Sequence, residues 1–260
     1  MLPMTAQREP NTSATADPPL PLLAPGPVEI WKRRALMSAL EWGFTIPYFQ
    51  LLNRVDAEGA ERLNSLPRRG VVFLSNHQTY FTEAIAFFDL LYRRRGLRWE
   101  DPYLRFSAAE ETMGQNLVTS LLTTAGAVTF RRSHRHGGVD LRRGVDLEGI
   151  GRIEQAIHSG WLLHFPTGTT RPGAPIRSGV SRLLHRTQAV AVPMRVDGFR
   201  EMLLHKQIPG RVGRRASIRV DEPLDLDRFF AQPYTPEAGA EVADRIAEAI
   251  GEAGTGPTTP

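Results

Sequence analysis

The stretch VVFLSNHQTYFTEA, residues 71–84, passes from an apolar run through a polar turn to the beginning of a predicted helix. The run at 71–74 is typical of a buried strand, and Thr82 with Glu83 is typical of a helix N-cap and an acidic first turn. A strand that leads directly into a helix is the repeating unit of α/β folds. His77 is therefore expected at the end of a buried strand, where such folds place their functional sites.

The alternation of strands and helices continues along the chain. Short apolar runs predict strands at residues 71–74, 127–130, 161–165, 189–196 and 217–220. Helical periodicity and capping residues predict helices at residues 82–95, 112–125, 147–158, 178–186 and 236–250. Strands that alternate with helices indicate an α/β fold with a mostly parallel central sheet flanked by helices.

Composition and periodicity divide the chain into four parts. Residues 1–27 are rich in Pro, Ala and Thr without an amphipathic period, which predicts a disordered tail, and residues 251–260 form a second such tail. Residues 28–55 are predicted to form an amphipathic helical segment, and residues 56–250 the α/β domain. No apolar window is long enough to predict a transmembrane helix.

The helical segment at 28–55 combines an aromatic residue with a basic cluster. Trp31 is followed directly by Lys32, Arg33 and Arg34. Basic residues beside tryptophan and aliphatic residues are typical of a helix that lies in a membrane interface. A helix packed on the protein core is the alternative. Pro47 is expected to break or kink the segment, because proline lacks the N–H that a helix needs.

Arginine supplies almost all of the positive charge, because lysine occurs only at positions 32 and 206 and the formal net charge is +4. Arginine favours bidentate contacts with phosphate and carboxylate, so an anionic partner is one interpretation and genomic base composition is the other. The sequence has no zinc, RNP-type or basic-helix signature, so no nucleic-acid partner is expected. The absence of cysteine excludes disulfides and a thiol nucleophile of this chain's own.

His77 is the best candidate for a general base among the seven histidines. An imidazole titrates near the working pH, so it can take a proton from a hydroxyl if a second group fixes its tautomer. Glu83 or Thr82 could do this from the predicted helix N-terminus, and Asn76 supplies an adjacent amide. On these residues alone, a structural histidine is the alternative.

The loop FPTGTTRPG at 165–173 could bind phosphate through hydroxyls, backbone N–H groups and a guanidinium. The residues that offer these groups are Thr167, Gly168, Thr169, Thr170 and Arg171. An ordinary turn is the alternative, since Pro, Gly and Thr are turn residues. Arg131 and Arg132 follow a predicted strand in GAVTFRR, and they are either anion ligands or part of a solvated face.

Taken in order, four stretches resemble the glycerolipid acyltransferase family, which includes the lysophosphatidic acid acyltransferases. The family carries the blocks N-H-x-x-x-x-D, G-x-x-F-I-x-R and F-P-E-G-T-R-S, and then a strand that contains V-P. This chain has SNHQTYFTEA, GAVTFRR, FPTGTT and AVPMRV in the same order, between about residues 71 and 198. The residues that match are Ser75, Asn76, His77, Gln78, Gly126, Arg132, Phe165, Pro166, Gly168, Thr169 and Pro193.

The departures from these blocks fall on functional positions. Thr82 stands in place of the aspartate, and the nearest acid, Glu83, comes one residue later. Thr167 replaces the glutamate of the third block, and Thr170 replaces its arginine, with Arg171 one place on. One residue turns a helix by about 100°, so Glu83 recovers the place of the aspartate only if the preceding turn is one residue longer. A dyad of His77 with Thr82, without an acid, is the alternative.

The resemblance implies an acyltransferase that moves a fatty acyl group from acyl-CoA or acyl carrier protein to a hydroxyl of a lysophospholipid or glycerol-phosphate-like acceptor. It implies His77 as general base, supported by Glu83 and Asn76. The residues implied in substrate binding are Thr82, Arg131, Arg132, Thr167, Gly168, Thr169, Thr170 and Arg171. Because the thioester supplies the driving force, no metal or redox cofactor is expected.

The resemblance also implies a peripheral protein at the cytoplasmic face of a membrane, where residues 28–55 and the arginine-rich surface would contact anionic lipid. Residues 56–250 would then be the acyltransferase-like domain. Because Thr82 and Thr167 replace the acidic residues of the family blocks, a second kind of function stays open. It is that of a catalytically weak relative that binds lipid or a partner.

Overall fold

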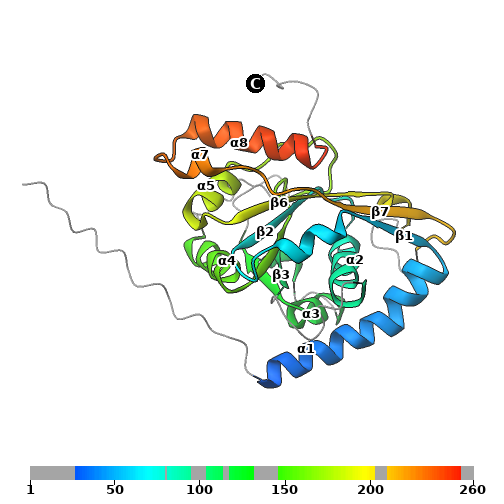
Figure 1. Cartoon of the computed structure of the whole chain (residues 1–260). Helices are drawn as coiled ribbons and strands as arrows, with labels where there is room; N and C mark the ends of the chain where they lie inside the picture. Colours follow the sequence, from blue (N-terminus) through cyan, green and yellow to red (C-terminus); the bar gives the residue numbers. More distant parts are fainter. Residues whose placement is uncertain are drawn as a thin grey trace, which may run out of the picture.

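The computed structural model describes residues 27–79, 81–94, 104–113, 117–131, 146–202 and 210–252. Its centre is a seven-stranded sheet with the order β1-β7-β6-β2-β5-β3-β4 (Figure 1). The strands are β1 (Arg54–Glu58), β2 (Val71–Ser75), β3 (Leu104–Ala109), β4 (Ala127–Phe130), β5 (Trp161–His164), β6 (Val190–Asp197) and β7 (Arg215–Val220). Neighbouring strands are parallel except for β6 and β7, so the predicted α/β fold with a mostly parallel sheet is confirmed.

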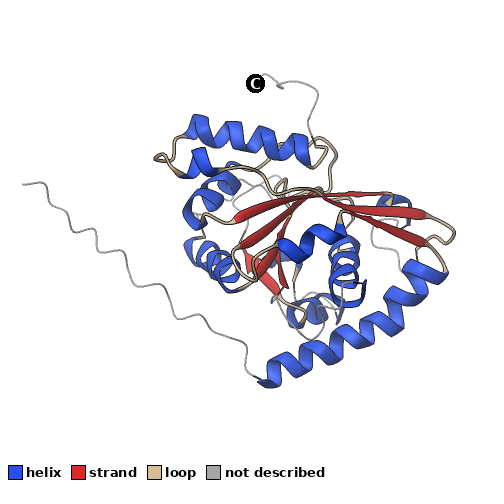
Figure 2. Ribbon diagram, viewed as in Figure 1, coloured by secondary structure: helices blue, strands red, loops and turns tan. Residues whose placement is uncertain are grey.

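Helices cover both faces of the sheet (Figure 2). They are α1 (Pro27–Leu40), α2 (Thr82–Asp89), α3 (Leu117–Thr124), α4 (Leu147–Ser159), α5 (Ser178–Thr187), α6 (Phe199–Met202), α7 (Asp227–Phe230) and α8 (Pro236–Ala249). Phe73 packs with α2 on one face, whereas Leu74 packs with α4, α5 and α8 on the other. Successive side chains of a strand point to opposite faces, so β2, which is apolar except for Ser75, is buried from both sides.

Two strands were not predicted from the sequence. The edge strand β1 and the inner strand β3 contain alternating polar residues, as in Arg54, Asp56, Arg105 and Ser107, so neither is a continuous apolar run. The N-cap of α2 is Phe81 and not Thr82, which is the first helical residue. The predicted tails at 1–27 and 251–260 lie almost wholly outside the described residues.

The N-terminal helical segment extends from α1 through two π-helical stretches, η1 (Glu41–Thr45) and η2 (Pro47–Leu51). Pro47 does not end the segment, because the helix widens around it: Ile46 N–H donates to the Glu41 carbonyl, and Leu52 N–H donates to the Pro47 carbonyl. The helical course ends near residue 52, and the last residues of the predicted segment 28–55 belong to β1.

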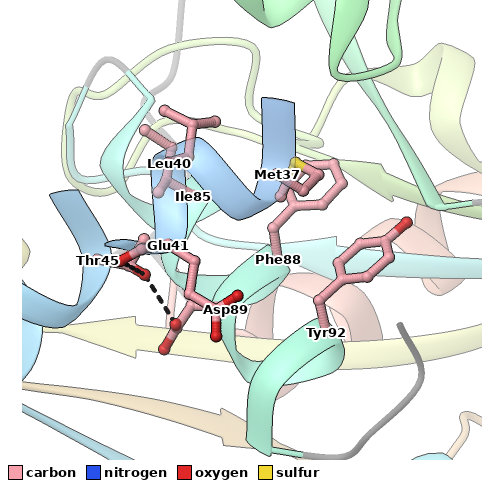
Figure 3. A pocket seen from close by; sticks show the side chains of 8 residues that line it. All are labelled: Met37, Leu40, Glu41, Thr45, Ile85, Phe88, Asp89 and Tyr92. Atoms are coloured by element: carbon pink, nitrogen blue, oxygen red, sulfur yellow. Dashed lines mark hydrogen bonds between the residues drawn. The ribbon is translucent and has the colours of Figure 1, made fainter. Parts of the chain in front are cut away.

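One face of this segment packs on α2 and on the π-helical turn η4 (Leu90–Arg94) that follows it (Figure 3). Thr45 Oγ1 donates a buried hydrogen bond of 2.9 Å to Asp89 Oδ1, which ties η1 to the end of α2. The same segment also exposes large apolar side chains. They are Val28, Trp31, Trp42, Leu51 and Leu52. No helix in the described part of the chain is long and apolar enough to cross a membrane.

Gly198 directly follows β6 with φ +76°, a conformation that L-residues rarely adopt, and its backbone passes close to β7. A Cβ at this position would lie 2.9 Å from Ala216 Cα and would also meet the Arg215 carbonyl. Gly173 has a similar φ of +66° but has nothing within 4 Å of a Cβ. Substitutions at the two positions therefore distinguish the cost of backbone strain alone from the cost of strain with steric overlap.

We expect Gly173→Ala to lower the free energy of unfolding by about 1 to 2 kcal/mol, which is the cost of the left-handed conformation. Gly198→Ala should cost about 1 to 3 kcal/mol more, because overpacking adds to that strain. Urea unfolding midpoints of both variants measure the difference. Equal losses of stability in the two variants would contradict this expectation and would show that β7 moves aside for the added Cβ.

Candidate active site

The parallel strands bring the first three sequence blocks to one edge of the sheet, and the fourth lies within the neighbouring strand β6. Ser75 ends β2 and pairs with Met194 of β6, and Leu74 pairs with His164, which ends β5. The loops that follow β2 and β5 therefore begin side by side, and β4 ends at the same edge because it also runs parallel. The carboxyl edge of a parallel sheet is the usual position for a site in α/β folds.

The structure places the Glu83 carboxylate beside His77. Glu83 Oε1 lies 3.6 Å from His77 Nδ1, and the Glu83 side chain is fully buried while 14% of the His77 side chain is exposed. This separation is longer than a hydrogen bond, so the contact is mainly an attraction between charges when the ring is protonated. The acid thus stands next to the imidazole although it comes one residue later than in the resembled block.

Glu83 also holds the turn that precedes α2. Its Oε1 accepts the backbone N–H groups of Gln78 and Thr79, and its Oε2 accepts the Thr79 hydroxyl at 2.5 Å. Thr79 Oγ1 in turn accepts the Thr82 N–H at 3.2 Å. The pair resembles a capping box, in which a hydroxyl residue and an acid satisfy each other's backbone donors. Glu83 is therefore a structural residue as well as a neighbour of His77.

Opposing effects set the pKa of Glu83. Burial on its own raises the pKa of this carboxyl, but the interaction with His77 and the Thr79 hydroxyl and backbone hydrogen bonds outweigh it. The net pKa lies below the ordinary value for glutamate. Glu83 is therefore anionic at neutral pH, which is the form that can orient an imidazole and stabilise its protonated state.

Phe165 joins the first and third blocks. Its ring stacks on the His77 ring with 4.1 Å between centroids and 20° between planes. Phe165 comes directly after His164, so the pairing of β5 with β2 carries it to this place. The stack limits rotation of the imidazole, and together with Glu83 it determines how the ring lies. Phe165 is in the matched block, but the sequence alone did not assign it a role.

The Asn76 side chain is engaged with the backbone of β6. Its Nδ2 donates to the Val196 carbonyl at 2.9 Å, and its Oδ1 accepts the Val196 N–H at 2.7 Å. The side chain thus continues the pairing of β2 with β6 by one step beyond Ser75. In this structure Asn76 anchors the first residue of the loop that carries His77.

The loop at 165–173 is a compact turn. Thr167 is buried and its hydroxyl donates to the Thr169 carbonyl at 2.9 Å, whereas the Thr169 hydroxyl accepts the Arg171 N–H at 3.3 Å. Gly168 has φ +64°. The Arg171 side chain is exposed. Both Thr167 and Thr169 hydroxyls therefore stabilise the turn itself.

Two residues that the sequence analysis did not select join these loops. The Gln78 amide donates to the Val196 carbonyl at 3.0 Å and accepts the Phe199 N–H at 3.0 Å. Arg200 donates to the carbonyls of Gln78 and Thr170, so it links the loop after β2 to the loop after β5. Gln78 follows His77 in the first block, but nothing in the sequence near Arg200 indicated this link.

A cavity of about 500 Å³ lies beside this edge, between the ends of β4 and β5 and the helices α4 and α5. Among the predicted substrate-binding residues, Arg131 and Gly168 line it, whereas Thr82, Thr167, Thr169, Thr170 and Arg171 do not. Arg131 forms an ion pair of 2.9 Å with Glu110. Arg132 lies outside the described residues.

His164 lines the same cavity and was not predicted as a site residue. Burial lowers its pKa to about 4, so the ring is neutral at physiological pH. Its Nδ1 lies 2.7 Å from the Ser107 hydroxyl on the neighbouring strand β3. A weakly basic, neutral imidazole is a poor general base but can still form hydrogen bonds within the cavity.

No family model matches this chain, and no curated protein matches it. Among solved structures, the chain is similar to the crystal structure of the 1-acyl-sn-glycerophosphate (LPA) acyltransferase PlsC from Thermotoga maritima. The TM-score is 0.47 and the sequence identity is 20%, and the match covers 84% of this chain and 78% of that chain.

Thr79 and Thr82 offer a matched pair of buried hydroxyls. Thr79 Oγ1 bonds to Glu83, whereas Thr82 Oγ1 has no hydrogen-bond partner in the described part of the chain. We expect Thr79→Val to lower the free energy of unfolding by about 1.5 to 3 kcal/mol, because a buried carboxylate loses a donor. Thr82→Val should leave it unchanged or raise it by up to about 1 kcal/mol. Denaturant unfolding tests both, and an equal loss in both variants would contradict this account.

Proposed function

We propose that the protein is an acyltransferase that moves a fatty acyl group from an acyl thioester to a hydroxyl of a lysophospholipid or glycerol-phosphate-like acceptor. Coenzyme A or acyl carrier protein would carry the thioester. The observation that carries the proposal is the position of His77, which lies at the carboxyl edge of the sheet between the buried Glu83 carboxylate and the Phe165 ring. This arrangement suits a general base that deprotonates a hydroxyl.

In the proposed reaction, His77 Nδ1 lies toward Glu83, and Nε2 is the nitrogen left to accept the proton of the acceptor hydroxyl. The alkoxide oxygen attacks the thioester carbonyl and forms the new ester bond as the carbon–sulfur bond breaks. The departing thiolate takes the proton back from the imidazolium. Glu83 stabilises the imidazolium that exists between these steps, because its lowered pKa keeps it anionic.

Substrate contacts are proposed on the side of the cavity. Arg131 and Gly168 line it, and Arg132 follows directly in the sequence. Arginine and free backbone N–H groups suit a phosphate on the acceptor. Asn76, Thr82, Thr167 and the turn at 169–171 would then support the loops around the site.

We expect His77→Ala to lower kcat/KM for acyl transfer by about 10²- to 10⁴-fold, the usual contribution of a general base. Transfer of a radiolabelled acyl group from acyl-CoA to lysophosphatidate measures the loss. His158→Ala is the matched control, since His158 is an exposed histidine at the end of α4. Equal rates for wild type and His77→Ala would contradict the role of His77 as general base.

Glu83→Gln separates the charge of this residue from its hydrogen bonds. The amide can still accept the N–H groups of the 78–79 turn through one oxygen, but it cannot stabilise an imidazolium by charge. We expect a loss of kcat of up to about 10⁴-fold, the effect of the equivalent change in a Ser-His-Asp system. A melting temperature measured alongside activity distinguishes this loss from unfolding, and an active Glu83→Gln enzyme would contradict the proposed role.

A second candidate function is a catalytically weak protein that binds lipid. It is motivated by the 3.6 Å gap between His77 and Glu83 and by the engagement of both Glu83 oxygens with the 78–79 turn. Wild-type protein that binds lysophosphatidate but transfers no acyl group, from either coenzyme A or carrier protein, would favour this function over the enzyme.

The N-terminal segment is proposed to hold the protein peripherally on an anionic membrane surface, at the cytoplasmic face. In this segment Trp31 is 68% exposed and Trp42 is 71% exposed. Lys32 is also exposed. Arg33 of the basic cluster is buried, but exposed tryptophan beside the exposed Lys32 suits the headgroup region of anionic lipid.

We expect the double variant Trp31→Ser/Trp42→Ser to bind vesicles of phosphatidylglycerol and phosphatidylcholine at least about 10-fold more weakly, because the loss of buried aromatic surface weakens partitioning. Cosedimentation with vesicles measures the affinity. Leu147→Ser is the control, since Leu147 is 73% exposed on α4, on the other face of the sheet. Unchanged vesicle binding in the tryptophan variant would contradict a role of this segment in membrane contact.

A further inference from the structure

The 500 Å³ cavity beside Phe165 carries an excess of positive charge. Its lining includes four arginines, Arg131, Arg177, Arg182 and Arg186, and two carboxylates, Asp146 and Glu154. Glu154 lies 3.0 Å from Arg186, and Arg131 pairs with Glu110, so these two arginines are largely neutralised by carboxylates. Within the described residues, Arg177 and Arg182 have no carboxylate within ion-pair distance.

Both of these arginines are held in place by contacts that leave their charge available. Arg177 Nε donates to the Thr167 carbonyl at 3.3 Å, and the Arg177 N–H donates to the Pro166 carbonyl at 3.0 Å. Arg182 lies over the Tyr234 ring, 5.1 Å from its centroid. A guanidinium held by one edge or one face loses less entropy when it binds an anion with its free nitrogens.

The backbone beside these side chains adds to the positive potential. Ser178 and Gly179 begin α5 and line the cavity. The first turn of α5 has no acidic residue, and no side chain caps it. Its N–H groups and the positive end of the helix dipole therefore lie next to Arg177. His164 adds no charge at neutral pH, because burial lowers its pKa to about 4.

The remainder of the cavity is apolar. Ile150 and Ile153 of α4 face Val180 and Leu183 of α5 across it, and Phe165 forms part of its wall. Phe165 also stacks on His77, so a residue of the cavity wall is in contact with the proposed base. A volume of about 500 Å³ is typical of small-molecule sites. The cavity therefore suits an amphiphile with an anionic end.

We infer that Arg177 and Arg182 bind the phosphate ester of an amphiphilic substrate in this cavity, with its apolar part between α4 and α5. The inference rests on the proposed acyl transfer and names the group that would hold one of its substrates. Either the acceptor phosphate or the phosphates of a coenzyme A donor would fit this chemistry. Arg171 of the loop at 165–173 does not line the cavity, whereas Arg177 and Arg182 do.

The test compares Arg177→Gln/Arg182→Gln with Arg69→Gln/Arg228→Gln, which removes two exposed arginines outside the cavity. Melting temperatures of both double variants establish that they fold. Calorimetric titrations with lysophosphatidate, with 1-acylglycerol and with coenzyme A measure binding without any acyl transfer. Acyl-transfer assays then give KM for the acceptor and for acyl-CoA.

We expect the Arg177/Arg182 variant to bind one phosphate-bearing ligand about 10- to 100-fold more weakly, with KM for that substrate raised to match, because charge-assisted hydrogen bonds are lost. Loss with lysophosphatidate but not with 1-acylglycerol identifies the acceptor phosphate, and loss with coenzyme A identifies the donor. Arginine-dependent binding without acyl transfer supports the site but contradicts the proposed function. Affinities for all three ligands equal to those of the control variant would overturn the inference.

Discussion

The Glu83 carboxylate is fully buried at the beginning of α2, so polar groups must balance its charge. An unbalanced buried charge costs several kcal/mol. The donors come from the turn after β2, which contributes two backbone N–H groups and the Thr79 hydroxyl. The turn is thus shaped by the need to satisfy this carboxylate, and His77 is carried to within 3.6 Å of it. Helix capping and the candidate chemistry depend on the same side chain.

The parallel sheet brings further residues to this candidate site. β2 lies between β5 and β6, so the loop that carries His77 is flanked by the loops that follow both neighbours. Phe165 from the β5 loop stacks on His77, whereas Asn76 and Gln78 hydrogen-bond to the Val196 backbone of β6. These contacts join residues about 90 to 120 positions apart, and they rest on the hydrogen-bonded register of three strands.

Arginine gives this chain its positive charge, but the individual arginines form different kinds of contact. Arg186 and Arg131 are paired with carboxylates, and Arg200 donates to backbone carbonyls that link two loops. Arg177 and Arg182 instead border a partly apolar cavity and have no carboxylate partner among the described residues. An arginine without a carboxylate partner favours the binding of an anion, because no ion pair has to be broken first. The proposed substrate contacts follow from this difference and not from the overall charge.

The sequence by itself determined the α/β class and the central strands, and it placed the candidate His77 at a strand end, because a fully buried strand is a continuous apolar run and its end is marked by polar residues. The nearest acid was also evident, although its place one residue late left its role open. Only the tertiary structure decided that Glu83 reaches His77, that Phe165 covers the ring, and that β1 and β3 complete the sheet. The cavity arginines on α5 were equally hidden, since strand register and helix packing, which no local pattern encodes, set which side chains share a space.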